Sequence, residues 1–331
     1  MTCLDDGAYR VGSATQAPSE TRGATNRGDG MSAHPGAGIR QRRLGSELRR
    51  LRAEAKVSQR DAGAHIDGGQ AKLSKIETGR QNIRRLELLA LLDLYGVADP
   101  ELREVLVSLL RKSSRPGWWH EYGNALRTDS LDVISLEAEC EQILQYCNMA
   151  LPDLLQTDEY ARALIGGLDP HLPDAQVEFF VQLRIRRQHV LNRGDPPRFV
   201  AVLDEALLRR PVGGSGTMAR QLRRLVEMSH RPGTTIQVVP TEQAVYPGMY
   251  GSFRVLYSSP PAALNVVETD HWTGSRYADE PGQVESHRLL LDTIRSSALP
   301  SQQSLEFISQ LSEEFDERDG AASRGSSMDR T

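Results

Sequence analysis

The segment Ser58-Gln-Arg-Asp-Ala-Gly-Ala-His-Ile-Asp-Gly-Gly-Gln-Ala-Lys-Leu-Ser-Lys-Ile-Glu-Thr-Gly79 decides the fold of the N-terminal part of the chain. Ser58 is a good helix cap, because its hydroxyl accepts a hydrogen bond from a free backbone N–H of the first turn. Asp67, Gly68 and Gly69 interrupt the pattern, since glycine adopts positive φ at little cost and aspartate stabilises turns. The segment therefore predicts a helix over 59–66 and a second one from 70 that ends at Gly79.

The second predicted helix has two different faces. Leu73 and Ile76 lie three residues apart and share one face, which we expect to be buried. The polar side chains Gln70, Lys72 and Lys75 fall mostly outside that stripe. Two short helices joined by a tight turn, with a polar and basic outer face on the second, are typical of a motif that places one helix in the major groove of DNA.

The flanking sequence completes a small helical domain. Leu44, Leu48 and Leu51 follow the period of an amphipathic helix, which predicts a helix over 40–55. Two further helices are predicted over 86–94, ending at Gly96, and over 100–112, beginning at Pro100. The sequence thus predicts an all-α helix-turn-helix domain of about five helices, residues 39–113, called the head below.

Charge separates the head from the rest of the chain. Residues 40–85 contain thirteen Lys or Arg and five Asp or Glu, a formal charge of +8. The whole chain carries −4, residues 1–39 sum to −1, and residues 86–331 therefore sum to −11. A basic head on an acidic body indicates that the head contacts phosphate and that the body does not.

Residues 44–96 resemble the helix-turn-helix domain of the phage Cro and repressor class, the XRE family. The matching pieces are Leu48-Arg49, Leu51-Arg52, Ser58-Gln59 and above all Ser74-Lys75-Ile76-Glu77-Thr78-Gly79. Two departures occur: Ala62-Gly63 replaces a larger apolar residue followed by alanine, and Asp67 stands at the usual turn glycine. The resemblance implies a sequence-specific regulator of transcription that binds double-stranded DNA.

The resemblance also assigns expected roles to individual residues. The base-contacting residues are Gln70, Ala71 and Lys72. The phosphate-contacting residues are Gln59, Arg60, Lys75 and Arg80. The structural residues of the motif are Leu73, Ile76, Glu77 and Gly79. Gln suits the donor and acceptor pattern of adenine and Lys the acceptor edge of guanine, whereas phosphate contacts set only the register. The alternative is that the polar residues are solvated surface groups. Glu77, acidic on a basic face, is expected to pair with an arginine of the first helix.

Length and composition limit the remaining possibilities. A chain of 331 residues suggests two domains, and no apolar run is long enough for a membrane span. Without a hydrophobic N-terminal segment, no signal peptide is expected, so we expect a cytoplasmic, nucleoid-associated protein. Residues 1–38 and 319–331 contain few large apolar groups and are expected to be disordered tails. Translation from Met31 would shorten the first tail.

Residues 117–318, called the body below, predict an α+β domain with a small mixed sheet. The predicted strands are 199–203, 235–240, 251–257 and 264–268. The predicted helices are 136–148, one through 160–164, 174–193, 217–229, 280–297 and 301–315. On the helix 136–148, Cys140 and Cys147 lie seven residues apart and are expected to share one buried face rather than half a metal site.

The body resembles the C-terminal domain of unknown function that follows a Cro-type head in many actinobacterial regulators. The matching pieces are Trp118-Trp119, Leu154–Thr157, Tyr160–Arg162, Arg187-Gln188, Leu203–Leu207, Arg210–Gly214, Gln221-Leu222, Val238–Pro240, Gly251–Phe253 and Val267–Thr269. The departures are Asp153 for a glycine and Asn265 for an aromatic residue. The resemblance implies an antitoxin-like regulator whose body binds a very small protein encoded nearby.

No enzyme motif is present, and we predict no catalytic, cofactor or metal site. Adjacent Asp204 and Glu205 point to opposite faces of a strand, which is poor geometry for shared acid–base chemistry. With Arg209 and Arg210 they are expected to form an ion network or a partner contact. The glycine-rich segment 213–216 precedes a helix, so a phosphate cradle is the alternative to a flexible loop.

Two other functions stay open at this point. The body could sense a small molecule through the Trp118-Trp119 region, which otherwise packs a domain seam, or through its sheet. Alternatively, the protein could be an interaction protein whose head does not bind DNA. A homodimer is expected for a DNA-binding head, because one recognition helix covers few base pairs and two-fold dimers contact two half-sites.

Overall fold

The computed structural model describes residues 38–113, 117–123, 126, 128–258, 264–270 and 275–328. The head contains the five predicted helices: α1 (Ile39–Glu54), α2 (Gln59–His65), α3 (Gly69–Glu77), α4 (Arg85–Leu94) and α5 (Pro100–Ser113). The helix ends follow the expected local chemistry. Gly79 and Gly96 have φ of +72° and +70°, and the Asp99 carboxylate accepts the Glu101 N–H at 2.9 Å at the start of α5.

The body is an α+β domain. Its strands are β1 (Cys140–Cys147), β2 (Arg198–Asp204), β3 (Thr234–Val239), β4 (Phe253–Ser258), β5 (Val266–Thr269) and β6 (Arg276–Ala278). Its α-helices are α6 (Thr128–Glu139), α7 (Asp158–Leu168), α8 (Asp174–Arg187), α9 (Glu205–Leu208), α10 (Ser215–Ser229), α11 (Pro281–Ser296) and α12 (Ser301–Met328). Short 3-10 helices are η1 (Trp118–Tyr122), η2 (Asp153–Leu155), η3 (Gln188–Asn192) and η4 (Pro247–Tyr250).

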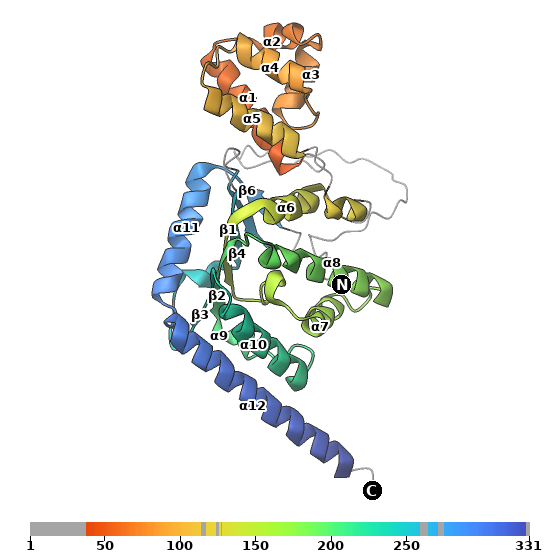
Figure 1. Ribbon diagram of the computed structural model, residues 1–331, viewed down its shortest axis with the longest axis vertical. Helices are drawn as coiled ribbons and strands as arrows, with labels where there is room; N and C mark the ends of the chain where they lie inside the picture. Colours follow the sequence, from red (N-terminus) through yellow and green to blue (C-terminus); the bar gives the residue numbers. More distant parts are fainter. Residues whose placement is uncertain are drawn as a thin grey trace, which may run out of the picture. The chain divides into compact units, whose positions relative to one another are not determined.

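The strands form one mixed sheet in the order β3-β2-β1-β4-β5-β6. β1, β2 and β3 are parallel, whereas β4, β5 and β6 continue the sheet in antiparallel fashion from β1. Helices α7, α8 and α10 lie on one side of the sheet and α11 on the other (Figure 1). The core under α11 includes Leu144, Val200, Val255 and Ile294. The mixed sheet was predicted, but with six strands it is larger than the sequence indicated.

The prediction of a helix over 136–148 was wrong beyond its first residues. α6 ends at Glu139, and residues 140–147 form β1, which pairs with β2 on one side and with β4 on the other. The spacing of the apolar residues matched a helix, but Ile143 and Tyr146 are both fully buried because a central strand is covered on both faces. Cys140 and Cys147 are both buried, as expected, although they lie on a strand with a register shift between Cys140 and Gln142 rather than on a helix.

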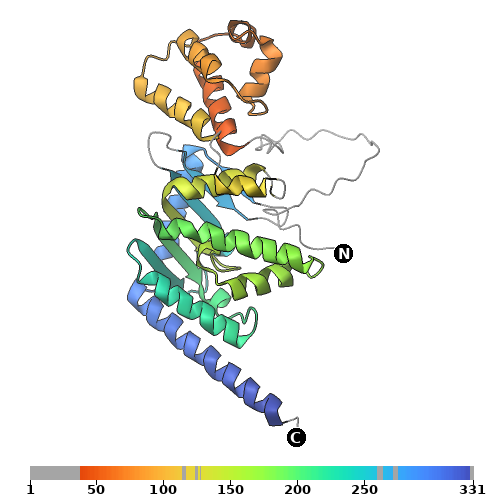
Figure 2. The same cartoon turned by 45° about the vertical axis from the view of Figure 1, so that its right-hand side comes forward.

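The other predicted strands and helices of the body begin within a few residues of their expected positions, but α9 and the part of α6 before Leu136 were not predicted, and two further differences concern β6 and α12. The three-residue edge strand β6 was not predicted. α12 continues to Met328, through most of the segment expected to be a tail. α12 lies along α10 (Figure 2). Two polar contacts join the two helices. Arg223 pairs with Asp316, and the Asp319 carboxylate accepts the Gly216 N–H at 3.1 Å.

The chain divides into two compact units between Ser135 and Leu136, within α6. The expected tail 1–38 lies outside the described residues apart from Gly38. Within the described part of the chain, no helix combines the length and the apolar character that a membrane crossing requires.

Candidate nucleic-acid interface

The two-helix motif in the head is built by local interactions. Ser58 caps α2 as predicted, its Oγ accepting the Asp61 N–H at 3.0 Å. The turn uses Asp67, with φ of +51°, and Gly69, with φ of +66°, so aspartate occupies a left-handed position that it tolerates better than most residues. α2 packs so closely on α3 that a Cβ on Gly63 would overlap the backbone of Gly69. The small pair Ala62-Gly63 therefore permits the close approach.

The inner face of α3 is fixed on the rest of the head. Leu73 and Ile76 are fully buried, as the spacing predicted, and burial of side chains of this size contributes about 1.5–3 kcal/mol each. Gly79 ends the motif against α1, since a Cβ there would come within 2.9 Å of the Arg42 Cα. Both its positive φ and this approach require glycine.

Glu77 holds three helices together. Its side chain is only 1% exposed and accepts hydrogen bonds from Arg52 Nε at 2.6 Å and Nη2 at 3.1 Å. The expected pairing with an arginine of the first helix is confirmed. A third bond comes from Gln59 Nε2 at 2.8 Å, so one of the two amide donors of this expected phosphate contact is already used inside the head.

The outer face of the motif is polar and accessible. Gln70 and Ala71 at the start of α3 are exposed, and so are the cationic side chains of Arg60, Lys75 and Arg80. This is the arrangement that the predicted base and phosphate contacts require. Their roles in DNA binding stay predictions.

Lys72 differs from the other expected contacts. Its Nζ forms an ion pair with Glu87 Oε1 at 2.7 Å, while Glu87 Oε2 accepts the Arg84 N–H at 3.0 Å in the cap of α4. Burial alone would raise the pKa of Glu87, but the Lys72 ammonium holds it below its ordinary value. Glu87 was not predicted as a partner of Lys72, because it lies fifteen residues away in the sequence.

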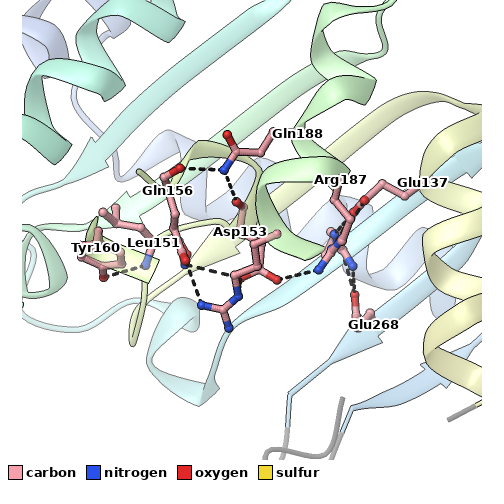
Figure 3. Close-up of polar contacts among 10 residues, drawn as sticks. Glu137, Leu151, Asp153, Gln156, Tyr160, Arg187, Gln188 and Glu268 are labelled. Atoms are coloured by element: carbon pink, nitrogen blue, oxygen red, sulfur yellow. Dashed lines mark hydrogen bonds and ion pairs between the residues drawn. The ribbon is translucent and has the colours of Figure 1, made fainter. Parts of the chain in front are cut away.

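The body contains a buried cluster of charged residues that the sequence analysis also missed (Figure 3). At its centre, Glu137 Oε1 and Oε2 accept Arg187 Nε at 3.0 Å and Nη2 at 2.8 Å. Arg254 Nη1 reaches the same carboxylate at 2.5 Å and also pairs with Glu268. Asp153 accepts Arg187 Nη1 at 2.9 Å. These residues come from α6, α8, β4, β5 and η2, so the cluster joins five elements of the body.

Amide side chains continue the cluster on its other side. Gln156 accepts Arg184 Nη1 at 2.9 Å and donates to the Leu151 carbonyl at 2.7 Å. Gln188 donates to the carbonyls of Gln156 at 2.7 Å and Asp153 at 3.1 Å. Burial alone would raise the pKa of Asp153, yet the charges of Arg184 and Arg187 outweigh it and lower the pKa to about 2. The buried charges of this cluster pair with one another, which is typical of a group that stabilises the fold.

The other groups singled out in the body have local partners. Asp204 accepts the Ala206 N–H at 2.7 Å and caps α9, and Glu205 pairs with Arg209 at 2.5 Å and accepts the Thr241 N–H at 2.8 Å. Arg210 is exposed. The glycine-rich loop has positive φ at Gly213 and Gly214. Trp118 and Trp119 form an edge-to-face pair with ring centroids 6.0 Å apart. Within the described part of the chain, His, Cys, Asp and Glu do not gather in a group that could hold a metal ion.

Comparison with known proteins agrees with this division of the chain. Residues 43–106 match the family described as a helix-turn-helix domain. Residues 131–310 match the domain of unknown function DUF5753. The comparisons with curated proteins and with solved structures found no match. The chain therefore carries a DNA-binding helix-turn-helix domain and belongs to the family defined by the C-terminal DUF5753 domain.

Proposed function

We propose that the protein is a sequence-specific, antitoxin-like regulator of transcription in the XRE class. Its α3 contacts bases in the major groove, and its body binds a small partner protein encoded nearby. One observation carries the DNA-binding part: Leu73 and Ile76 are buried while Gln70, Ala71 and Lys75 on the same helix are exposed. α3 is thereby fixed from behind and accessible in front, as major-groove recognition requires.

The body is regulatory rather than catalytic in this proposal. Two adjacent carboxylates were considered for acid–base chemistry. Asp204 caps α9, and Glu205 pairs with Arg209. The protein acts as a homodimer, so that two recognition helices contact half-sites separated by one helical turn of DNA, about 34 Å. Binding of the partner to the body changes the affinity for DNA.

Fluorescence anisotropy of the full-length protein with its own upstream DNA and with a scrambled duplex tests this proposal. We expect the upstream duplex to bind at least ~10³-fold more tightly, as specific sites do. Addition of the purified small protein is expected to shift that affinity, whereas metabolites are not. Equal affinity for both duplexes at every salt concentration would contradict a sequence-specific regulator.

Arg60 and Arg80 are expected to contact phosphate. Replacement of both by alanine should weaken binding to the upstream and scrambled duplexes alike. It should also reduce the slope of log K against log salt by about 1.8, because each phosphate contact contributes about 0.9. Arg111→Ala removes an exposed cation from α5 and is the matched control with an unchanged slope. Loss of affinity for the upstream duplex alone would instead assign base contacts to these arginines.

Glu87 restrains Lys72 in the free protein. Glu87→Gln removes the carboxylate 2.7 Å from Lys72 Nζ, so the ammonium becomes available to the DNA. We expect several-fold tighter DNA binding and a salt slope steeper by up to about 0.9. Glu104→Gln makes the same change of charge at an exposed position of α5 and serves as the control. If both variants bind DNA equally, Lys72 does not take part in binding.

A further inference from the structure

Four large apolar side chains are exposed on two loops of the body. Met149 follows β1 and is 66% exposed, while Val245, Met249 and Tyr250 lie between β3 and β4 and are 80%, 63% and 98% exposed. We call these four residues the apolar display. Exposed apolar residues scattered singly are common, but clustered ones indicate an interaction surface. Tyrosine and methionine are also enriched in protein interfaces.

The two loops that carry the display are tied together by hydrogen bonds. Asn148 Nδ2 donates to the Gly248 carbonyl at 3.1 Å. Ser252 Oγ accepts the Asn148 N–H at 3.0 Å and donates to Asn148 Oδ1 at 2.8 Å. Because Met149 and Met249 directly follow the two joined residues, they extend from neighbouring points of the backbone.

A buried, hydrogen-bonded pair of tyrosines fixes the longer loop. Tyr146 and Tyr246 join their hydroxyls at 2.6 Å, and Tyr246 donates in turn to Asp204. Gly248 lies directly over this pair, since a Cβ there would come within 2.5 Å of the Tyr146 ring. The exposed side chains therefore stand on an ordered backbone, which reduces the entropy lost on binding.

The charges around the display favour one kind of occupant. The two loops, residues 148–157 and 240–252, contain no Lys, Arg or His. Of their two acids, Asp153 pairs with Arg187 in the buried cluster, whereas Glu242 is exposed. Glu280 lies at the N-cap of α11, which packs against η4, while Glu285 on the same helix pairs with Arg288. A two-fold pairing of this surface with itself would bring the Glu242 and Glu280 carboxylates of both copies into one interface without a basic partner from these loops, which is unfavourable. An apolar segment flanked by basic residues complements both the display and its acidic surroundings.

We propose that the apolar display binds a segment of a different protein that presents an apolar anchor flanked by Lys or Arg. This inference rests on the proposed binding of a partner by the body and identifies where that partner docks. Tyr250 and Met249 insert between apolar side chains of the partner, and Glu242 pairs with its basic residues.

In-cell photo-crosslinking tests this assignment in the producing organism. Full-length protein carries benzoylphenylalanine in place of Tyr250 or, as a control, in place of Leu289, which is 52% exposed on α11. We expect an adduct with a different protein at position 250 only. Sequencing of the crosslinked peptide should show Lys or Arg within a few residues of an apolar side chain. An adduct between two copies of the chain, a peptide without basic residues, or no adduct beyond the control would overturn the proposal.

The captured protein is then purified and titrated against full-length wild type and two variants. Met249→Ser/Tyr250→Ser is expected to weaken binding at least tenfold, and Leu289→Ser less than twofold. The double variant removes only exposed apolar groups, so the fold should not change. If it binds the captured protein as tightly as wild type does, the docking site lies elsewhere while partner binding by the body stands. If wild type binds no protein, both proposals fail.

Discussion

Replacement of Glu137 by glutamine is expected to lower the free energy of unfolding of the body by roughly 3–5 kcal/mol, as removal of one partner from a buried ion pair does. The Glu137 side chain is 2% exposed and faces two buried guanidinium groups, those of Arg187 and Arg254. Glutamine keeps the volume but leaves these cations short of one negative charge. Asp153 and Glu268 remain as partners, so the loss should lie near the lower end of the range.

Urea unfolding of the full-length protein, followed by a signal from the body, measures this effect. Glu285→Gln is the matched control, because Glu285 pairs with Arg288 at 2.6 Å on an exposed face of α11. A surface pair of this kind contributes below about 1 kcal/mol. Equal losses of stability in both variants would show that the buried cluster does not stabilise the body.

The same cluster makes the body sensitive to acid. Burial alone would raise the pKa of Glu137, but Arg187 and Arg254 hold it below its ordinary value. A carboxyl group with a lowered folded-state pKa stabilises the fold above its unfolded-state pKa of about 4.3, and that contribution is lost as the pH falls further. The difference in stability between wild type and Glu137→Gln should therefore stay constant from neutral pH down to about pH 5 and narrow as the pH falls below the unfolded-state pKa of about 4.3.

Replacement of Glu77 by alanine is the second change with a large expected effect. It leaves Arg52 without its carboxylate in a site where the Glu77 side chain is 1% exposed, and it also removes the acceptor of Gln59. We expect the head to lose about 3 kcal/mol or more, since one partner of a buried pair is missing. Gln59→Ala, which removes one neutral donor, should cost only about 1 kcal/mol.

Hydrogen exchange of the full-length protein separates the head from the body in this experiment. In Glu77→Ala, amides of α1, α2 and α3 should exchange faster, while those of β1, β2 and β4 should keep wild-type protection. DNA binding should be lost together with protection of the head. Unchanged protection of α3 would contradict the role assigned to Glu77.

Local signals explain why the head could be predicted from sequence. Each signal acts within a few residues of its own position and can therefore be recognised in the sequence. The signals are the helix cap at Ser58, the turn at Asp67 and the C-terminal cap at Gly79. The structural role of Glu77 was also predictable, because an acidic residue on a basic face needs a partner. The contact between Lys72 and Glu87 was not, since it depends on how α4 returns to α3.

Long-range packing explains what could not be predicted in the body. Residues 140–147 follow a helical period by coincidence, and only their position between β2 and β4 makes them a strand. The charged cluster joins residues as distant as Glu137 and Glu268. Arginine and glutamate are normally surface residues, so nothing local distinguishes these from the exposed ones.

Sequence-specific contact by α3 is the central claim, and one anisotropy experiment tests it most directly. Wild type and Gln70→Ala are titrated with the upstream duplex and with its scrambled counterpart at several salt concentrations. We expect the variant to lose about 1–3 kcal/mol of its preference for the upstream duplex, the value of one good base contact. Its affinity for the scrambled duplex and its salt slope should stay unchanged. A variant that keeps the full wild-type preference would contradict the assignment of α3 as the recognition helix.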